Sequence, residues 1–88
     1  MLDDTLAKIK VLKAELRKLE AKHAEKAASV AGFADAAAHE AARGNRSSKR
    51  LQLALEGLAD AAQELEATHP NLAATVVEIC RELSSLGI

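Results

Sequence analysis

The chain of 88 residues is poor in aromatic residues, cysteine and proline, with one of each kind: Phe33, Cys80 and Pro70. Without more aromatic rings, base-stacking platforms and aromatic ligand cages are excluded. A lone cysteine forms no intramolecular disulfide and belongs to no paired-cysteine zinc motif. An unpaired thiol is typical of a protein from a reducing compartment.

The sequence also lacks an excess of charge and any long hydrophobic run. Its formal net charge is −1, with acidic and basic residues interspersed, so no basic field favours nucleic acid as a partner. No stretch approaches the roughly 18–20 apolar residues of a membrane span. The acidic start at residues 1–4 differs from a signal peptide. We therefore expect a cytoplasmic protein without a membrane partner.

What the sequence does contain is helical periodicity. Hydrophobic residues make up 49% of the chain, and the composition, rich in alanine and poor in glycine and proline, is that of long helices. Apolar positions recur at alternating steps of three and four, which predicts an all-α fold with one apolar stripe per helix. The stripe positions are Leu2, Leu6, Ile9, Leu16, Ala27, Val30, Ala34, Ala37 and Ala41, then Leu51, Leu55, Leu58, Ala62, Leu65, Leu72, Val76, Ile79, Leu83 and Leu86.

One clear break interrupts the pattern, at residues 44–48. Gly44 suits the position just after a helix, and Ser47 or Ser48 suits the N-cap of the next helix. We predict a single domain over residues 1–88 with a helix at 2–43, a turn at 44–48 and a helix at 49–87. Because the stripe keeps its phase around Pro70, we expect a kink near 68–70 rather than a chain reversal.

Folding the chain at Arg46 brings the two stripes into register. Positions whose numbers add up to 92 then face each other, as Leu6 and Leu86 or Ala41 and Leu51 do. This predicts an antiparallel two-helix hairpin of the coiled-coil kind. Arms of about 42 residues, each rising 1.5 Å, make a rod of roughly 60 Å.

Some apolar residues lie beyond this seam. Leu12, Leu19 and Phe33 each precede a stripe position and share one edge. They either widen the stripe or form an oligomer interface that joins hairpins into a four-helix bundle. We expect the second, as a homo-oligomer (dimer or tetramer), because so small a chain usually needs a partner to complete its core.

Two clusters are candidate binding sites. His23 and His69 fall in the same layer of the hairpin, where imidazoles can bind a metal ion or form a polar layer that fixes the register. The tip holds Arg43, Arg46, Lys49 and Arg50 without an acidic residue among them. This basic tip either binds an anion, including nucleic acid, or is an ordinary charged loop.

Catalysis has no support in the sequence. No nucleotide-binding glycine motif or HExxH pattern occurs, and the serines have no arranged base. We therefore expect no enzyme and no cofactor. The leading hypothesis is a helical interaction or oligomerisation module, and the alternatives are a metal- or ligand-binding bundle that uses His23 and His69 and anion docking at the basic tip.

Several short segments also resemble a known family. These are His23-Ala24-Glu25, Val30-Ala31-Gly32-Phe33, His39-Glu40-Ala41-Ala42-Arg43, Leu55-Glu56-Gly57-Leu58, His69-Pro70-Asn71-Leu72 and Leu83-Ser84-Ser85-Leu86-Gly87-Ile88. Together they resemble a family of short bacterial helical proteins designated domain of unknown function 4404. The resemblance implies a small bacterial protein and supplies no activity and no site residues.

Overall fold

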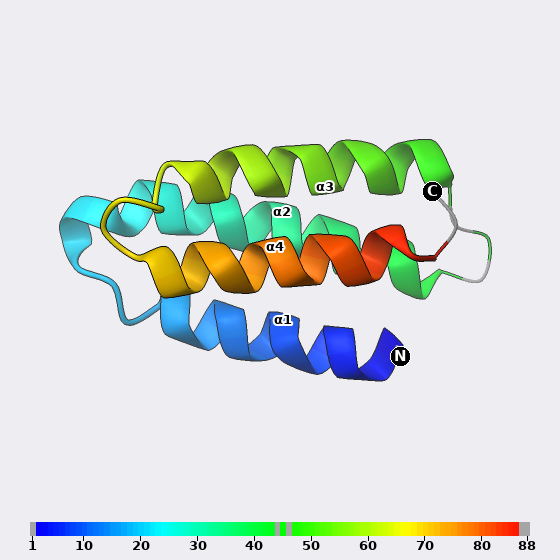
Figure 1. Cartoon of the computed structure of the whole chain (residues 1–88), viewed down its shortest axis with the longest axis horizontal. Coiled ribbons are helices and arrows are strands. Elements are labelled where there is room, and N and C mark those ends of the chain that lie inside the picture. Colours follow the sequence, from blue (N-terminus) through cyan, green and yellow to red (C-terminus); the bar gives the residue numbers. More distant parts are fainter. Residues whose placement is uncertain (1, 44, 46, 87–88) are drawn as a thin grey trace.

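In a computed structural model, which describes residues 2–43, 45 and 47–86, the chain forms four α-helices and one 3₁₀ turn. The helices are α1 (Leu2–Leu16), α2 (Ala24–Ala42), α3 (Ser48–Gln63) and α4 (Pro70–Ser84), and the 3₁₀ turn η1 is Ala21–His23. Each helix runs antiparallel to the one before it (Figure 1). The result is an up-and-down four-helix bundle within one chain.

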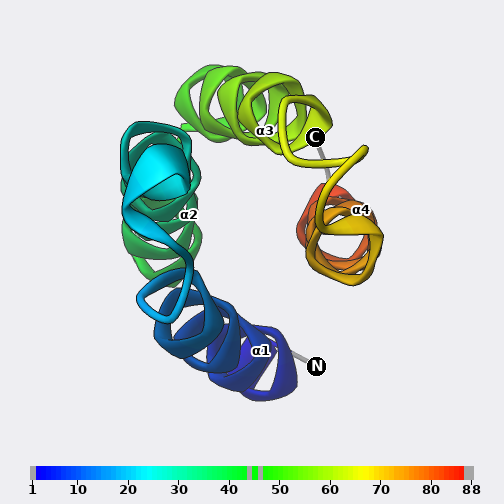
Figure 2. The same cartoon turned by 90° about the vertical axis from the view of Figure 1, so that its left-hand side faces the viewer.

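Every helix packs against two neighbours, because α1 contacts both α2 and α4, and α3 contacts the same two helices. Figure 2 shows the four helices arranged around one central core. The apolar stripes of the sequence face this core, as their three-and-four spacing requires. The core includes Ile9, Leu12, Leu16, Val30, Ala34, Ala37, Leu51, Leu58, Leu65, Val76, Ile79 and Leu83.

The predicted all-α class is confirmed, but the two long helices are wrong. The predicted helix 2–43 is interrupted after Leu16, and the predicted helix 49–87 is interrupted after Gln63. The molecule measures 38 × 21 × 16 Å, and not the roughly 60 Å expected for a rod. The predicted two-helix hairpin is thus folded a second time, so that α1 packs back against α2 and α4 packs back against α3.

The first unexpected reversal lies at residues 17–23 and contains neither glycine nor proline. The helix tightens into turns as the Lys18 N–H donates to the Glu15 carbonyl at 3.1 Å and the Leu19 N–H to the Leu16 carbonyl at 3.3 Å. Glu20 is extended, with φ −60° and ψ 156°. No residue in this segment is of a type that commonly ends a helix. The apolar periodicity therefore predicted a helix that continues through it.

The second reversal, at residues 64–69, corrects the kink expected near Pro70. Pro70 is at the first position of α4, with His69 as its N-cap. A proline fits there because the N–H it lacks would have had no partner within the helix. The proline therefore starts a new helix that runs back along α3, and it does not bend one continuous helix.

Helix α2 ends at Ala42 and α3 begins at Ser48, so the break between the two helices overlaps the turn predicted at 44–48. Ser47 is the N-cap of α3, and its hydroxyl accepts a hydrogen bond from the Arg50 N–H at 3.2 Å. This satisfies one of the free N–H groups at the helix start. Gly44 and Arg46 lie outside the described residues, as does the proposed ending at Gly87.

Candidate functional site

The predicted contact between His23 and His69 is present. Their ring centroids are 4.9 Å apart, with the ring planes at 86°, and the Thr68 hydroxyl lies 2.9 Å from His69 Nδ1. In this edge-to-face arrangement one ring points its edge at the face of the other, so the two rings pack together. Among the described residues, no group of three or more His, Cys, Asp and Glu side chains could hold a metal ion.

The basic tip is organised around an acidic residue that the sequence prediction overlooked. Glu40 is only 6% exposed; one of its carboxylate oxygens accepts the Ser47 N–H at 2.7 Å and the other accepts from the Arg43 guanidinium at 3.2 Å. Lys49 and Arg50 are exposed. Glu40 directly precedes the stripe residue Ala41 and lies three residues before Arg43, and this spacing was the available signal.

Glu40 therefore holds the α2–α3 loop against the bundle. The Ser47 hydrogen bond is the main cause that lowers the pKa of Glu40, and the charges of Arg43 and Arg50 add to it while burial opposes it. A carboxyl whose pKa is lower in the folded state stabilises the fold above the ordinary glutamate pKa of about 4.3. That contribution is lost as the pH falls through the pKa of the folded state.

We expect this loss to be measurable in Glu40→Gln. The variant should be less stable than the wild type at pH 7, and the difference should shrink as the pH is lowered from 5 toward 2. Urea unfolding followed by circular dichroism at a series of pH values measures it. Glu64→Gln, at an exposed carboxyl, controls for the change in net charge. A difference between wild type and Glu40→Gln that is constant with pH would contradict the role of Glu40.

The proposed oligomer edge of Leu12, Leu19 and Phe33 is not a common surface, and this prediction needs correction. Leu12 is 1% exposed and lies in the core. Leu19 is partly buried and lies against the core. Phe33 is 41% exposed, but its ring lies on α3 over Gly57, where an added Cβ would come within 2.3 Å of the ring. These residues serve contacts within the chain.

Ion pairs distinguish the grooves between neighbouring helices on the surface of the described residues. Between α1 and α2, Lys13 Nζ lies 2.7 Å from Asp35. Between α1 and α4, Lys8 Nζ pairs with Glu82 and lies 2.6 Å from Glu78. Of the ion pairs among the described residues, none joins α3 to α4.

The α1–α4 groove is a polar seam that connects the first helix to the last. The Thr5 hydroxyl donates to Glu82 at 2.5 Å, so Glu82 is bound by both Thr5 and Lys8. Hydrogen bonds from Lys8 and then Thr5 lower the pKa of Glu82, while those to Glu78 and Glu82 raise the pKa of Lys8. These charged groups are satisfied by each other, so the seam closes the bundle where no loop connects its helices.

The α3–α4 groove differs in that no ion pair among the described residues crosses it, and alanine, proline and valine line much of it. One part has a volume of about 270 Å³ and the other about 320 Å³. Ala59 lines both parts, so they form one groove along the two helices. Its lining residues are Gln52, Leu55, Glu56, Ala59, Ala62, Gln63, Glu66, Pro70, Ala73, Ala74, Val76, Val77, Cys80 and Ser84.

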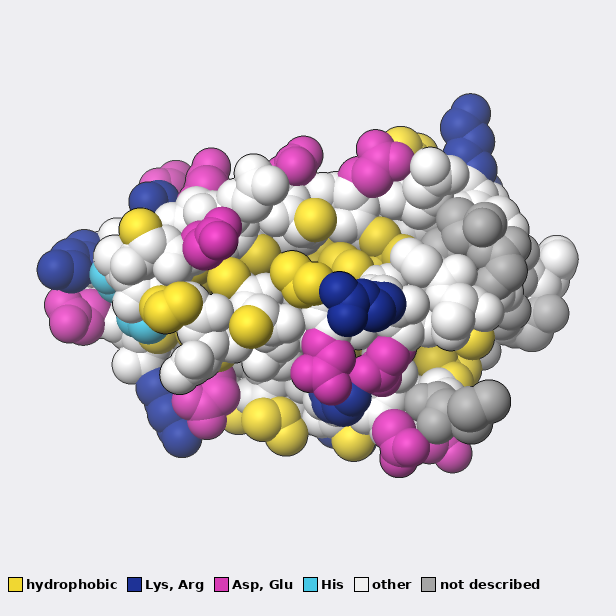
Figure 3. Space-filling view, viewed as in Figure 1, with side chains coloured by type: hydrophobic (Ala, Val, Ile, Leu, Met, Phe, Trp, Pro, Cys, Tyr) yellow, Lys and Arg dark blue, Asp and Glu magenta, His cyan; other side chains and the backbone are white. Residues whose placement is uncertain are grey.

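Hydrophobic side chains gather over this groove on the face shown in Figure 3. Val77 is 54% exposed on its α4 wall. Cys80 is half-buried, with its thiol 3.8 Å from the Leu55 carbonyl, and burial raises its pKa, which keeps the thiol protonated. The groove therefore offers apolar packing rather than a reactive group, and we treat it as the candidate functional site.

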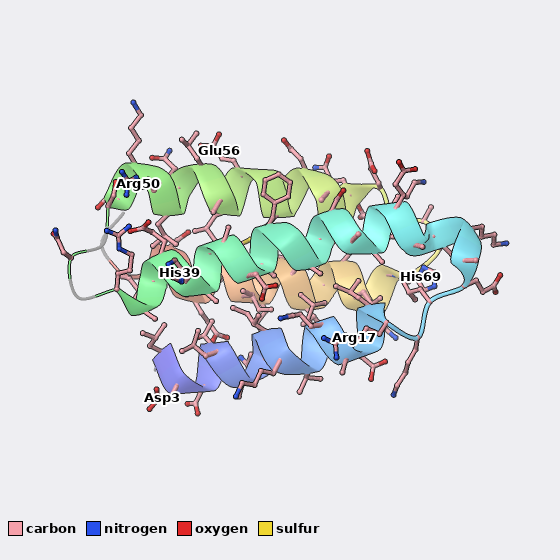
Figure 4. All side chains as sticks on the ribbon, turned by 180° about the vertical axis from the view of Figure 1, so that it is seen from behind. Asp3, Arg17, His39, Arg50, Glu56 and His69 are labelled. Carbon is pink, nitrogen blue, oxygen red and sulfur yellow. The ribbon has the colours of Figure 1, made fainter. Side chains whose placement is uncertain are left out.

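The other two predicted binding sites, the histidine pair and the basic tip, lie far apart in the bundle. His39 is exposed on the outer face of α2, and His69 lies at the end of the bundle opposite Arg50 (Figure 4). The histidine pair and the basic tip are thus at opposite ends of the molecule.

No helix among the described residues has the length and apolar character needed to cross a membrane.

Comparisons with known proteins identify the family and nothing more specific. No curated protein and no solved structure matches the chain. The family model described as a domain of unknown function (DUF4404) matches residues 3–88. This match covers nearly the whole four-helix bundle and agrees with the resemblance of the short segments. The chain therefore belongs to the DUF4404 family.

Proposed function

We propose that the chain is a non-enzymatic helical module that associates with a second copy of itself through the α3–α4 groove. The observation that carries the proposal is the exposed Val77 beside a row of small apolar residues, which no ion pair of the described part of the chain crosses. Small residues on a helical surface let another helix approach closely. Burial of such a groove against another copy removes apolar surface from water, which favours association.

The size of this face also supports self-association. The face seen in Figure 1 measures 38 × 21 Å. A standard protein interface buries about 800 Å² on each partner, so a second copy would have to cover most of this face. A chain of 9.3 kDa buries a modest core by itself, and association would add to it.

Replacing Val77 with aspartate tests the proposal. In a single copy the new carboxylate faces water, so helicity should be retained. In the proposed complex it would be buried without a partner, which costs several kcal/mol, and the dissociation constant should rise by about two orders of magnitude or more. Sedimentation equilibrium over a range of concentrations measures the change in mass.

Val11→Asp is the matched control. Val11 is 61% exposed on α1, away from the α3–α4 groove, so this change should leave association intact. A wild-type chain that sediments as a monomer at all concentrations up to hundreds of micromolar would overturn the proposal. Equal dispersal by Val77→Asp and Val11→Asp would also overturn the assignment of the groove.

A further inference from the structure

The two halves of the chain repeat each other at a distance of 46 positions. His23 corresponds to His69 in this alignment, and the segment Ala27-Ala28-Ser29-Val30 corresponds to Ala73-Ala74-Thr75-Val76. Leu12 and Leu58 also correspond, as do Leu19-Glu20-Ala21 and Leu65-Glu66-Ala67. The sequence is therefore two versions of one helical hairpin.

The fold obeys the same repeat. A shift of 46 positions aligns α1 with α3 and α2 with α4. The two helices of each aligned pair lie across the bundle from one another (Figure 2). The contact of α2 with α3 is then equivalent to the contact of α1 with α4. His23 and His69 touch each other, as equivalent residues do only beside the axis that relates them. The bundle thus has an approximate two-fold axis parallel to its helices.

This symmetry gives the molecule two equivalent grooves on opposite sides. The α1–α2 groove is lined by Leu16, Ala24, Ala27, Ala28 and Ala31, among others. Their equivalents Ala62, Pro70, Ala73, Ala74 and Val77 line the α3–α4 groove. The α1–α2 groove of one copy could therefore dock on the α3–α4 groove of the next copy. Such a head-to-tail contact generates open chains or rings.

The charges beside the two grooves are inverted. Lys10 on α1 corresponds to Glu56 on α3, and Asp35 on α2 corresponds to Arg81 on α4. All four side chains are at the surface. The Cys80 thiol reaches the Leu55 carbonyl, so their neighbours Arg81 and Glu56 lie at the same level along the α3–α4 groove.

The inversion decides which grooves can face each other. Suppose that the α1–α2 groove of one copy docks on the α3–α4 groove of another, with α2 facing α3 and α1 facing α4 as they do inside the bundle. Glu56 of one copy would then face Asp35 of the other. Arg81 would likewise face Lys10. Like charges placed opposite each other oppose association. If both copies use the α3–α4 groove, Glu56 of each faces Arg81 of the other.

The α1–α2 groove is also less suited to a second copy. The ion pair of Lys13 and Asp35 crosses it, and Arg17 adds a second cation to its lining. The equivalents of Lys13 and Arg17 in the α3–α4 groove are the uncharged Ala59 and Gln63. Among the described residues, no ion pair involves Glu56 or Arg81, so both remain available to a partner.

We infer that the inverted charges of the repeat restrict self-association to a closed dimer of α3–α4 grooves. Its two-fold axis is parallel to the helices, Val77 of each copy packs near Ala59 of the other, and two ion pairs join Glu56 and Arg81 between the copies. The inference rests on the proposed function, since it specifies the partner surface and the geometry of the same groove.

Charge reversal in separate chains tests this geometry. Glu56→Arg and Arg81→Glu should each weaken self-association at least tenfold, because each places like charges opposite each other twice. An equimolar mixture of the two variants should associate as the wild type does, since every reversed charge then faces its opposite. Sedimentation velocity of each variant and of the mixture, with helicity checked by circular dichroism, gives the readout.

The double variant Glu56→Arg/Arg81→Glu should still associate through two α3–α4 grooves, but its reversed charges also complement Asp35 and Lys10 of the α1–α2 groove, so it should form assemblies larger than a dimer as well. Single variants that associate like the wild type, a mixture that stays dissociated, or wild-type assemblies beyond the dimer would each overturn the closed geometry. The proposed function has a separate test, because Val77→Asp would still disperse the complex if the groove is used in another orientation. A monomeric wild type would overturn both.

Discussion

Replacing Leu12 with alanine is expected to lower the free energy of unfolding by about 2–5 kcal/mol, the range measured for buried leucines. Leu12 is 1% exposed and lines a small internal gap together with residues from all four helices. Since a domain is stabilised by only about 5–15 kcal/mol, this loss is large. The melting temperature should fall by on the order of 10–30 °C, as thermal unfolding followed by circular dichroism would record.

Leu53→Ala makes the same chemical change at a surface position. Leu53 is 56% exposed on α3, so its truncation should change stability by no more than about 0.5 kcal/mol. Both substitutions are best measured in the Val77→Asp background, where self-association is removed from the comparison. If Leu12→Ala proved as mild as Leu53→Ala, Leu12 would be on an outer edge, as in the two-helix rod, and the four-helix bundle would be wrong.

The Leu12 position also shows where the sequence prediction succeeded and where it failed. Its place beside the stripe predicted a second seam and a four-helix bundle, and such a bundle is present. The partner helices, however, come from the same chain. Periodicity reports which side of a helix is buried and carries no information on whether the covering helix belongs to the same molecule.

The two reversals were missed for different physical reasons. At residues 17–23 the stop is made by backbone turns among ordinary helix-forming residues, and such a stop is decided by packing of the whole bundle. At Pro70 the signal was present, but a proline both starts helices and bends them. The preserved phase of the stripe favoured the bend.

Local features were predicted more successfully. The hydroxyl of Ser47 caps α3, and Ser47 is one of the two serines that residue type offered for this role. The contact of His23 with His69 followed from the register about the central turn, because folding the hairpin a second time preserves that register. The α3–α4 groove could not be predicted, because it exists only after α4 has turned back along α3.

The two helical glycines form a matched pair for the last prediction. Glycine inside a helix is less favourable than alanine by about 0.8–1 kcal/mol. An added Cβ at Gly32 in α2 meets nothing within 4 Å, so Gly32→Ala should stabilise the protein by about that amount. At Gly57 in α3 the added Cβ would lie 2.3–2.7 Å from three atoms of the Phe33 ring, and the ring must move.

Displacing the ring costs its contact with α3, and burial of a whole phenylalanine side chain is worth about 1.5–3 kcal/mol. Since Phe33 is 41% exposed, roughly half of that free energy is at stake. Gly57→Ala should therefore be neutral or destabilising, about 1–2 kcal/mol less favourable than Gly32→Ala.

In a Phe33→Ala background the penalty should vanish, and Gly57→Ala should stabilise as Gly32→Ala does. Urea unfolding of the four combinations of Phe33 and Gly57 measures their coupling. A coupling near zero would mean that Phe33 does not lie on Gly57, and Phe33 would then be free to serve the oligomer interface expected from the sequence.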